Sequence, residues 1–270
     1  MLTLYKIALA PALLLQGSHL RRTALRLPEA AGPRSGLFGA AGDTAAAPLR
    51  LLFVGDSSAA GVGVDWQHEA MPHQAAEIVA SRLNRPVHWQ LLAKSGANTW
   101  EAAGLLRAHE RELEFELHHP FDIVVTALGV NDVTSQHSAR RFVADYASLL
   151  QAVRERTGAF RAVVSGLPPM RSLPAAPQPL RWYLGQCASR LDQALHRFCA
   201  SDANLRFVSL GWAKAHEMAA DKFHPGKGQY RQWAEMVAEQ VIALVQLSPS
   251  SIGPSAAAVE FNRYESTRVS

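Results

Sequence analysis

The sequence contains little cysteine. Only Cys187 and Cys199 occur among the 270 residues, which is too few for a disulfide framework, and their spacing fits no zinc-binding pattern. Both lie in one predicted helix, where their separation of twelve residues corresponds to about 18 Å, too far for a disulfide bond. We interpret them as two buried thiols rather than as a redox pair.

The sequence also lacks a long apolar run near its N-terminus. Ile7–Leu15 has about nine residues, whereas a membrane-spanning helix needs about 20. A secretory signal has an apolar core of this length, but Pro11 interrupts the run, no typical cleavage site closely follows it, and the basic pair Arg21-Arg22 comes after it. Three interpretations stay open: a helix docked on the protein, a helix on an anionic membrane surface, and an atypical signal peptide. We expect a cytoplasmic protein or one peripheral at the inner membrane, with secretion through such a signal as the alternative.

Several motifs of common enzyme classes are absent. The sequence has no Gly-x-x-x-x-Gly-Lys-Ser/Thr P-loop, no His-Glu-x-x-His zinc motif and no Gly-x-Ser-x-Gly elbow of the α/β-hydrolases. The Gly-Val-Gly segment at 61–63 lacks the third glycine of a dinucleotide fingerprint, because Trp66 stands there. His118 and His119 precede Pro120 at a predicted helix end, where they indicate a C-terminal cap. We therefore expect no metal ion.

Positive charge is concentrated at one end of the chain. The formal net charge is +4, and residues 1–50, with six basic and two acidic residues, account for all of it. A nucleic-acid-binding domain would carry its positive charge on the folded part, so we expect no nucleic-acid partner. Apolar residues make up 48% of the chain, and the length suffices for one large domain with a buried core.

Strand-like and helix-like segments alternate along the middle of the chain. We expect strands at 49–55, 87–93, 121–128, 160–165 and 205–209, and helices at 73–83, 99–116, 138–156, 180–199 and 229–247. Such alternation implies right-handed crossovers and a parallel sheet covered on both faces. The sequence predicts an α/β fold: a three-layer α/β/α sandwich around a five-stranded parallel sheet.

The two ends of the chain differ from this middle part. Residues 1–48 are expected to form a basic N-terminal segment, ending in a linker at 31–48 that is rich in Gly, Ala and Pro. Residues 49–247 form the expected main domain, and residues 248–270 are expected to be a mobile tail.

Three chemically distinctive residues each follow a predicted strand. Ser57 follows the first strand, Gly96 the second and Asn131 the third. Because the carboxyl ends of parallel strands meet at one edge of a sheet, we expect these residues to lie close together. His224, with Asp221 three residues before it, lies in a loop ahead of the last helix. Each fragment alone is typical of an ordinary turn, but their combination favours a catalytic site.

These residues suit a serine hydrolase. A serine hydroxyl such as that of Ser57 needs a base, for which His224 is the candidate. Asp221 can fix the tautomer of that histidine and stabilise its charged form. The backbone N–H groups of Ser57 and Gly96 and the side-chain N–H of Asn131 can form an oxyanion hole.

The four fragments resemble the four sequence blocks of the SGNH hydrolases, also called the GDSL esterase/lipase family. Ser57, Gly96, Asn131 and His224 stand at the positions that give the family its name, and the resemblance covers about residues 49–246. The segment from Phe223-His224-Pro225-Gly226 through Tyr230 to Trp233-Ala234 is similar to the end of bacterial members.

The first block departs from the family pattern at one position. It reads Gly-Asp-Ser-Ser where Gly-Asp-Ser-Leu is common, so Ser58 is a second serine beside the candidate nucleophile. We assign the nucleophile to Ser57, because the motif places it directly after Gly-Asp.

The resemblance implies a flavodoxin-like fold and hydrolysis of an ester or thioester through an acyl-enzyme, without a metal or organic cofactor. We expect a serine esterase whose partner is a small acyl ester of short to medium chain length. A carbohydrate O-acetyl esterase, a lysophospholipase and a thioesterase are alternatives on the same site. A non-catalytic flavodoxin-like binding module is the alternative from another class, and the oligomeric state is left open.

Four further residues are candidates for substrate binding. Trp66, Met170, Trp182 and Phe223 lie in predicted loops or helix starts near the same sheet edge. They suit an acyl pocket, although aromatic residues at such places are at least as often plain packing.

Overall fold

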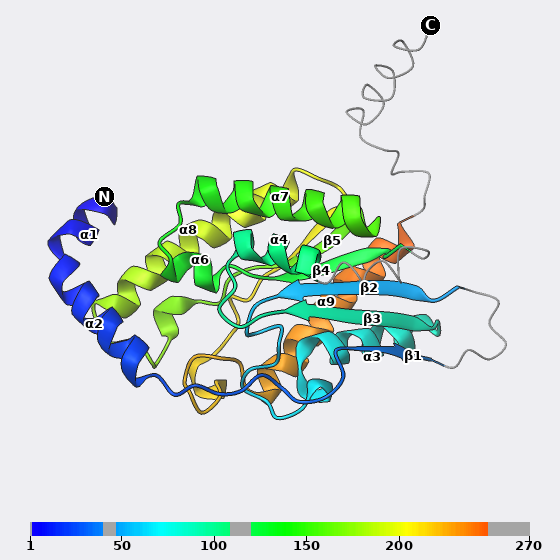
Figure 1. Ribbon diagram of the computed structural model, residues 1–270, viewed down its shortest axis with the longest axis horizontal. Helices are drawn as coiled ribbons and strands as arrows, with labels where there is room; N and C mark the ends of the chain where they lie inside the picture. Colours follow the sequence, from blue (N-terminus) through cyan, green and yellow to red (C-terminus); the bar gives the residue numbers. More distant parts are fainter. Residues whose placement is uncertain (1, 40–46, 109–119, 248–270) are drawn as a thin grey trace, which may run out of the picture.

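The computed structural model describes residues 2–39, 47–108 and 120–247 (Figure 1). Within these residues the sheet has six strands in the order β1-β3-β2-β4-β5-β6. Strand β1 pairs antiparallel with β3, and all other pairs are parallel. The strands are β1 (Ser35–Phe38), β2 (Leu49–Gly55), β3 (Val87–Ala93), β4 (Ile123–Ala127), β5 (Arg161–Ser165) and β6 (Leu205–Val208).

Helices cover both faces of the sheet, which confirms the predicted α/β class (Figure 1). One face packs on α3 (Met71–Leu83) and α9 (Lys227–Gln246), and the other on α4 (Thr99–Ala108), α7 (Ala139–Thr157) and α8 (Leu180–Ala200). The buried strand β2 serves both cores: Leu51 and Phe53 belong to the first, whereas Leu52 and Val54 belong to the second. This alternation follows from the two-residue period of a strand, and it explains why the sequence of β2 is apolar throughout.

The structure adds elements that the sequence analysis did not include. A short helix, α6 (Val130–Thr134), follows β4, and 3-10 turns span Gln67–Glu69, Met170–Ser172 and Ala215–Glu217. The helix expected at 99–116 is described only to Ala108, and the expected tail at 248–270 lies outside the described residues.

Strand β1 is the sixth strand, where five were expected, and it comes from the stretch interpreted as a linker. Its four residues alternate between exposed and half-buried, so they show no apolar run that would have indicated a strand. Gly36 fits here because a Cβ would lie 2.9 Å from the indole nitrogen of Trp89 on β3. The strand therefore forms through its partner rather than through its own propensity.

The N-terminal residues form two helices, α1 (Leu2–Ala8) and α2 (Ala10–Thr23), of which α2 packs beside α8 (Figure 1). The side chain of Gln16 donates to the carbonyl of Gln178 at 2.7 Å and accepts from the N–H of Leu180 at 3.0 Å. The ring of Tyr5 meets that of Trp182 edge-on at 5.2 Å. These contacts are those of a docked helix. Among the described residues no helix is long and apolar enough to cross a membrane.

Candidate active site

Three of the predicted site residues form a continuous hydrogen-bonded chain. Ser57 follows β2, and its Oγ lies 2.8 Å from Nε2 of His224, although 167 residues separate the two in sequence. Nδ1 of His224 lies 2.5 Å from Oδ2 of Asp221. The side chains of His224 and Asp221 are mostly buried, so little water competes for these bonds. The structure thus brings the serine, the histidine and the aspartate into the sequence of contacts that a catalytic triad would need.

The aspartate is held by the loop that carries the histidine. Oδ1 of Asp221 accepts the backbone N–H groups of Phe223 and His224, each at 3.0 Å. Burial by itself raises the pKa of this carboxyl, but the hydrogen bonds from His224 and Phe223 outweigh it and leave the pKa of Asp221 lowered. Asp221 is therefore a carboxylate with fixed geometry, which selects the His224 tautomer that carries its proton on Nδ1.

A side chain on the last helix, α9, holds the turn after β2 by hydrogen bonds. The hydroxyl of Tyr230 on α9 donates toward the carbonyls of Ser58 at 3.0 Å and of Val62 at 2.8 Å. Gly55 allows the tight exit from the strand, because a Cβ there would lie 2.4 Å from Cβ of Ala59. The nucleophile candidate therefore sits on a backbone that packing and hydrogen bonds hold rigid.

The neighbouring residues Asp56 and Ser58 are hydrogen-bonded to each other. Oδ1 of Asp56 accepts the backbone N–H of Ser58 at 2.9 Å and its hydroxyl at 2.7 Å. Asp56 is fully buried, and this burial raises its pKa. Because the hydroxyl of Ser58 is directed to Asp56 whereas that of Ser57 reaches His224, the geometry favours Ser57 as the nucleophile.

The turn that contains Gly96 lies beside this site. The N–H of Ala97 donates to the carbonyl of Lys94 at 3.1 Å, and Gly96 has a φ of +84°. The side-chain nitrogen of Asn131 donates to the carbonyl of Ala97 at 3.0 Å and to Oδ2 of Asp56 at 3.2 Å, so Asn131 ties this turn to the loop after β2. Among described residues, the N–H of Gly96 donates to no other group.

Within the described part of the chain, the backbone N–H of Ser57 also donates to no protein group. The two backbone donors expected for an oxyanion hole are thus unoccupied by protein acceptors. The third, Asn131, already uses both N–H groups of its side-chain amide on protein oxygens, so it would have to release one of them to bind a substrate oxygen.

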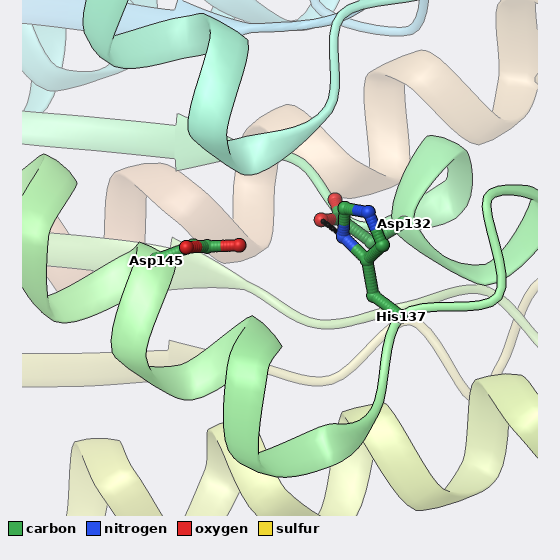
Figure 2. Close-up of side chains that lie close together, drawn as sticks. All are labelled: Asp132, His137 and Asp145. Carbon is green, nitrogen blue, oxygen red and sulfur yellow. Dashed lines mark hydrogen bonds and ion pairs between the residues drawn. The ribbon is translucent and has the colours of Figure 1, made fainter.

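A second cluster of side chains, from Asp132, His137 and Asp145, begins at the residue after Asn131 (Figure 2). The fully buried Asp132 accepts the N–H of Thr99 at 3.1 Å and its hydroxyl at 2.9 Å, while its other oxygen lies 2.9 Å from Nδ1 of His137. Asp145 on α7 points toward the pair (Figure 2), and one ligand atom from each of the three residues lies within 4.8 Å of the others. Both oxygens of Asp132 already bind protein groups, and through Thr99 the cluster joins α6 to the start of α4.

An apolar pocket opens beside Ser57 and His224. Its cavity volume is about 60 Å³, and most of its lining comes from loops after β4, β5 and β6 and from α9. The main apolar residues of its wall are Leu128, Val130, Pro168, Leu210, Trp212, Met218, Phe223 and Trp233.

Only Phe223 of the four expected substrate-binding residues lines this pocket. Met170 is buried in the core under α7 and α8, Trp182 contacts Tyr5, and Trp66 is 54% exposed on the surface. The sequence analysis missed Trp212, whose one signal was its position after the last predicted strand. An aromatic residue in a loop near a sheet edge can pack against several different neighbours. Which of these residues line the pocket depends on the path of each loop in the folded protein.

Sequence and structure comparisons identify the class of protein. The chain matches the GDSL-like Lipase/Acylhydrolase family over residues 53–239, and it therefore belongs to this family. It is a carboxylic ester hydrolase of the GDSL/SGNH type. No curated protein matches the chain in sequence.

Solved structures of similar fold include several esterases. TesA is 20% identical, with a TM-score of 0.54 over 72% of this chain and 99% of that one. The aryl esterase of M. smegmatis is 18% identical, with a TM-score of 0.54 over 73% and 99%. Est24, a carbohydrate acetylesterase from Sinorhizobium meliloti, is 16% identical, with a TM-score of 0.53 over 73% and 99%. At such identities these likenesses establish the shared fold.

Proposed function

We propose that the chain is a serine esterase that hydrolyses short- to medium-chain acyl esters through an acyl-enzyme. The observation that carries this proposal is the 2.8 Å contact between Oγ of Ser57 and Nε2 of His224. A serine hydroxyl is a poor nucleophile until a base accepts its proton, and this contact supplies the base beside an apolar pocket.

The chemistry proceeds in two halves. Oγ of Ser57 attacks the ester carbonyl carbon while its proton passes to Nε2 of His224, and the carboxylate of Asp221 stabilises the resulting imidazolium. The tetrahedral intermediate collapses when His224 returns that proton to the departing alkoxide, which leaves as the alcohol. Water, deprotonated by His224, then attacks the acyl-enzyme and releases the carboxylic acid and free Ser57.

The oxyanion hole consists of the N–H groups of Ser57 and Gly96 and the side-chain amide of Asn131. The longer of the two Asn131 bonds, at 3.2 Å to Asp56, is the one that the amide exchanges for the substrate oxyanion. Removing one donor of this kind costs about 2.7–4 kcal/mol of transition-state stabilisation.

The size of the pocket supports the short end of the chain-length range. A cavity needs about 10–15 Å³ of such space to hold one water, so the cavity of about 60 Å³ has room for only a few waters. This space suits an acetyl to butyryl group better than a long acyl chain. An acetyl ester of a carbohydrate is the second candidate substrate, favoured by this small cavity and by the fold shared with a carbohydrate acetylesterase.

The proposal is tested with p-nitrophenyl acetate, butyrate and octanoate. Ser57→Ala and His224→Ala are expected to lose nearly all hydrolysis while their circular dichroism spectra stay unchanged. Ser58→Ala, which removes only a hydroxyl bonded to Asp56, is expected to retain measurable activity. Full activity in Ser57→Ala, or loss of activity in Ser58→Ala alone, would refute the assignment.

A further inference from the structure

A segment outside the matched family region lies against the candidate oxyanion turn. Residues 29–34 precede β1 and run along the loops that follow β2 and β3. The N–H groups of Ala30 and Ala31 donate to the carbonyls of Ala60 and Asp65 at 3.1 and 2.9 Å, and the N–H of Gln67 donates back to Ala31 at 2.8 Å. Ala30 is buried in the core. The segment is therefore anchored by its backbone.

Glu29 joins this anchored segment to the turn. Its Oε1 accepts both the backbone N–H of Ser95 at 2.9 Å and the hydroxyl of Ser95 at 2.6 Å. Its other oxygen, Oε2, is paired with the guanidinium of Arg34, which also donates to the carbonyl of Ala93 at 2.9 Å. One carboxylate thus binds the turn directly, and through Arg34 it binds the end of the strand that leads into the turn.

The turn at residues 94–97 needs such support to keep its central peptide in one orientation. Residues 94–97 fit a type II turn, because the N–H of Ala97 bonds the carbonyl of Lys94 and Gly96 has a φ of +84°. Type I and type II turns differ mainly in the orientation of their central peptide, which here carries the N–H of Gly96. A Cβ at Gly96 would find no atom within 4 Å, so side-chain packing over Gly96 does not hold the peptide in place.

We propose that Glu29 is a positioning residue for the esterase reaction, which fixes Ser95 so that the next peptide keeps the N–H of Gly96 directed into the oxyanion hole. The inference rests on the function proposed above and adds to it a residue outside the family match at 53–239. Glu29 is not among the residues that line the pocket, so it acts on the donor rather than on the substrate.

The charge state of Glu29 suits this role. Burial raises its pKa, but the hydrogen bonds from Ser95 and the contact with Arg34 outweigh burial and lower the pKa overall. The carboxylate is therefore ionised at neutral pH, and bonds from N–H and O–H groups to an ionised acceptor are stronger than those to a neutral one.

The experiment compares Glu29→Ala, Glu29→Gln and Ser95→Ala with the unaltered protein. Glu29→Ala is expected to lower kcat by about ten- to a hundredfold, less than the 10²–10³ for complete loss of a donor, with KM changed by less than about threefold. Glu29→Gln keeps an oxygen that can accept from Ser95 and is expected to retain more activity than Glu29→Ala. Ser95→Ala loses only the hydroxyl bond and is expected to show the smallest loss.

A second measurement separates positioning from a general structural role. A trifluoromethyl ketone forms a tetrahedral oxyanion adduct with the active serine, so its affinity is expected to fall in parallel with kcat across the variants. Glu235→Ala removes another surface ion pair, with Arg231, and is the matched control, expected to change neither kcat nor ketone affinity.

The outcomes distinguish this inference from the proposed function. If Ser57→Ala is inactive while Glu29→Ala keeps full kcat, or if kcat falls without a matching loss of ketone affinity, the role of Glu29 is overturned and the esterase assignment stands. If Ser57→Ala stays active, both fail. Should Glu29→Ala not fold, unchanged kcat in both Glu29→Gln and Ser95→Ala overturns the inference.

Discussion

The backbone of Gly63 lies directly against the carbonyl of Pro225, beside the candidate catalytic histidine. A Cβ at Gly63 would lie 2.4 Å from the carbonyl oxygen of Pro225 and 3.4 Å from Cβ of His224, and Gly63 itself has a φ of +110°. Only glycine adopts this backbone conformation without strain. The turn after β2 and the histidine loop therefore pack together at a point where no side chain fits.

We predict that Gly63→Ala displaces the histidine loop. The substitution is expected to lower the free energy of unfolding by about 1–3 kcal/mol, measured by urea denaturation, and to lower kcat about tenfold or more because the Ser57–His224 bond is misaligned. Gly228→Ala is the control, because a Cβ there meets nothing within 4 Å and the position lies in α9, where alanine is favoured. Equal behaviour of the two variants would contradict the prediction.

Asp221→Asn is expected to lower kcat by about 10²- to 10⁴-fold, because the amide no longer favours the reactive tautomer of His224 or stabilises its charge. KM should change little, since Asp221 does not line the pocket. Steady-state kinetics with p-nitrophenyl acetate provide the measurement. An Asp221→Asn enzyme with kcat within threefold of the unaltered protein would show that the carboxylate has no part in the reaction.

Asp221 is also expected to make the stability of the folded protein depend on pH. The pKa of Asp221 is lowered in the folded protein, so folding favours its ionised form. The stabilisation from this residue is complete above its unfolded pKa of about 3.9 and is lost as the pH falls through the still lower folded pKa. The thermal stability of the unaltered protein should therefore fall more steeply with acidification below about pH 4 than that of Asp221→Asn. If the thermal stability of the two proteins fell equally with acidification, the predicted pH dependence would be wrong.

Trp212 is expected to limit the length of the acyl group. It forms part of the pocket wall, so Trp212→Ala should raise the ratio of kcat/KM for p-nitrophenyl octanoate over acetate by about tenfold, a change of about 1.4 kcal/mol in relative transition-state binding. Trp66→Ala should leave the ratio unchanged, because Trp66 lies on the surface and does not line the pocket. A shift with Trp66→Ala but not with Trp212→Ala would show that the acyl group binds elsewhere.

Contact with an anionic membrane stays a prediction from the N-terminal sequence. Residues 2–28 contain no acidic residue, and on α2 the exposed Leu14 and Leu15 each lie seven positions before a basic residue, Arg21 or Arg22. This spacing puts apolar and basic side chains on one face of the helix. Figure 1 places α1 and α2 at the end of the molecule toward which the parallel strands run, which is the end that carries the candidate site.

Co-sedimentation with vesicles tests this prediction. The protein is expected to bind vesicles that contain phosphatidylglycerol better than vesicles of phosphatidylcholine alone, and salt should weaken the binding. The double variant Leu14→Asp, Leu15→Asp should bind about tenfold more weakly or worse, because it removes apolar surface and adds negative charge. Binding unaffected by the double variant, or no binding at all, would leave the helices as docked elements.

The sequence predicted the central strands and the serine–histidine–aspartate set because both depend on local signals. Apolar runs such as that of β2 mark buried strands, and Ser57, Gly96 and Asn131 each lie a few residues after the end of a strand. Topology then places them at one edge. The reciprocal bonds between Asn98 and Glu101, each near 3 Å, likewise form a local capping box at the start of the helix expected from residue 99.

The missed features depend on contacts between distant segments. Strand β1 forms because β3 offers an open edge, and nothing in its own residues indicates a strand. Glu29 lies 66 residues before Ser95, so no spacing rule connects the two. Among loop aromatics, Trp212 turns into the pocket whereas Trp66 does not, and that difference is set by the path of each loop.

Covalent labelling of the nucleophile tests the central claim most directly. The full chain is treated with a fluorophosphonate probe, digested, and mapped by mass spectrometry, with His224→Ala as the comparison. We predict that the probe attaches to the hydroxyl of Ser57, and that labelling of His224→Ala is at least about a hundredfold slower because no base accepts the proton. Absence of labelling, attachment to Ser58 or to a distant serine, or equal labelling of His224→Ala would contradict the account.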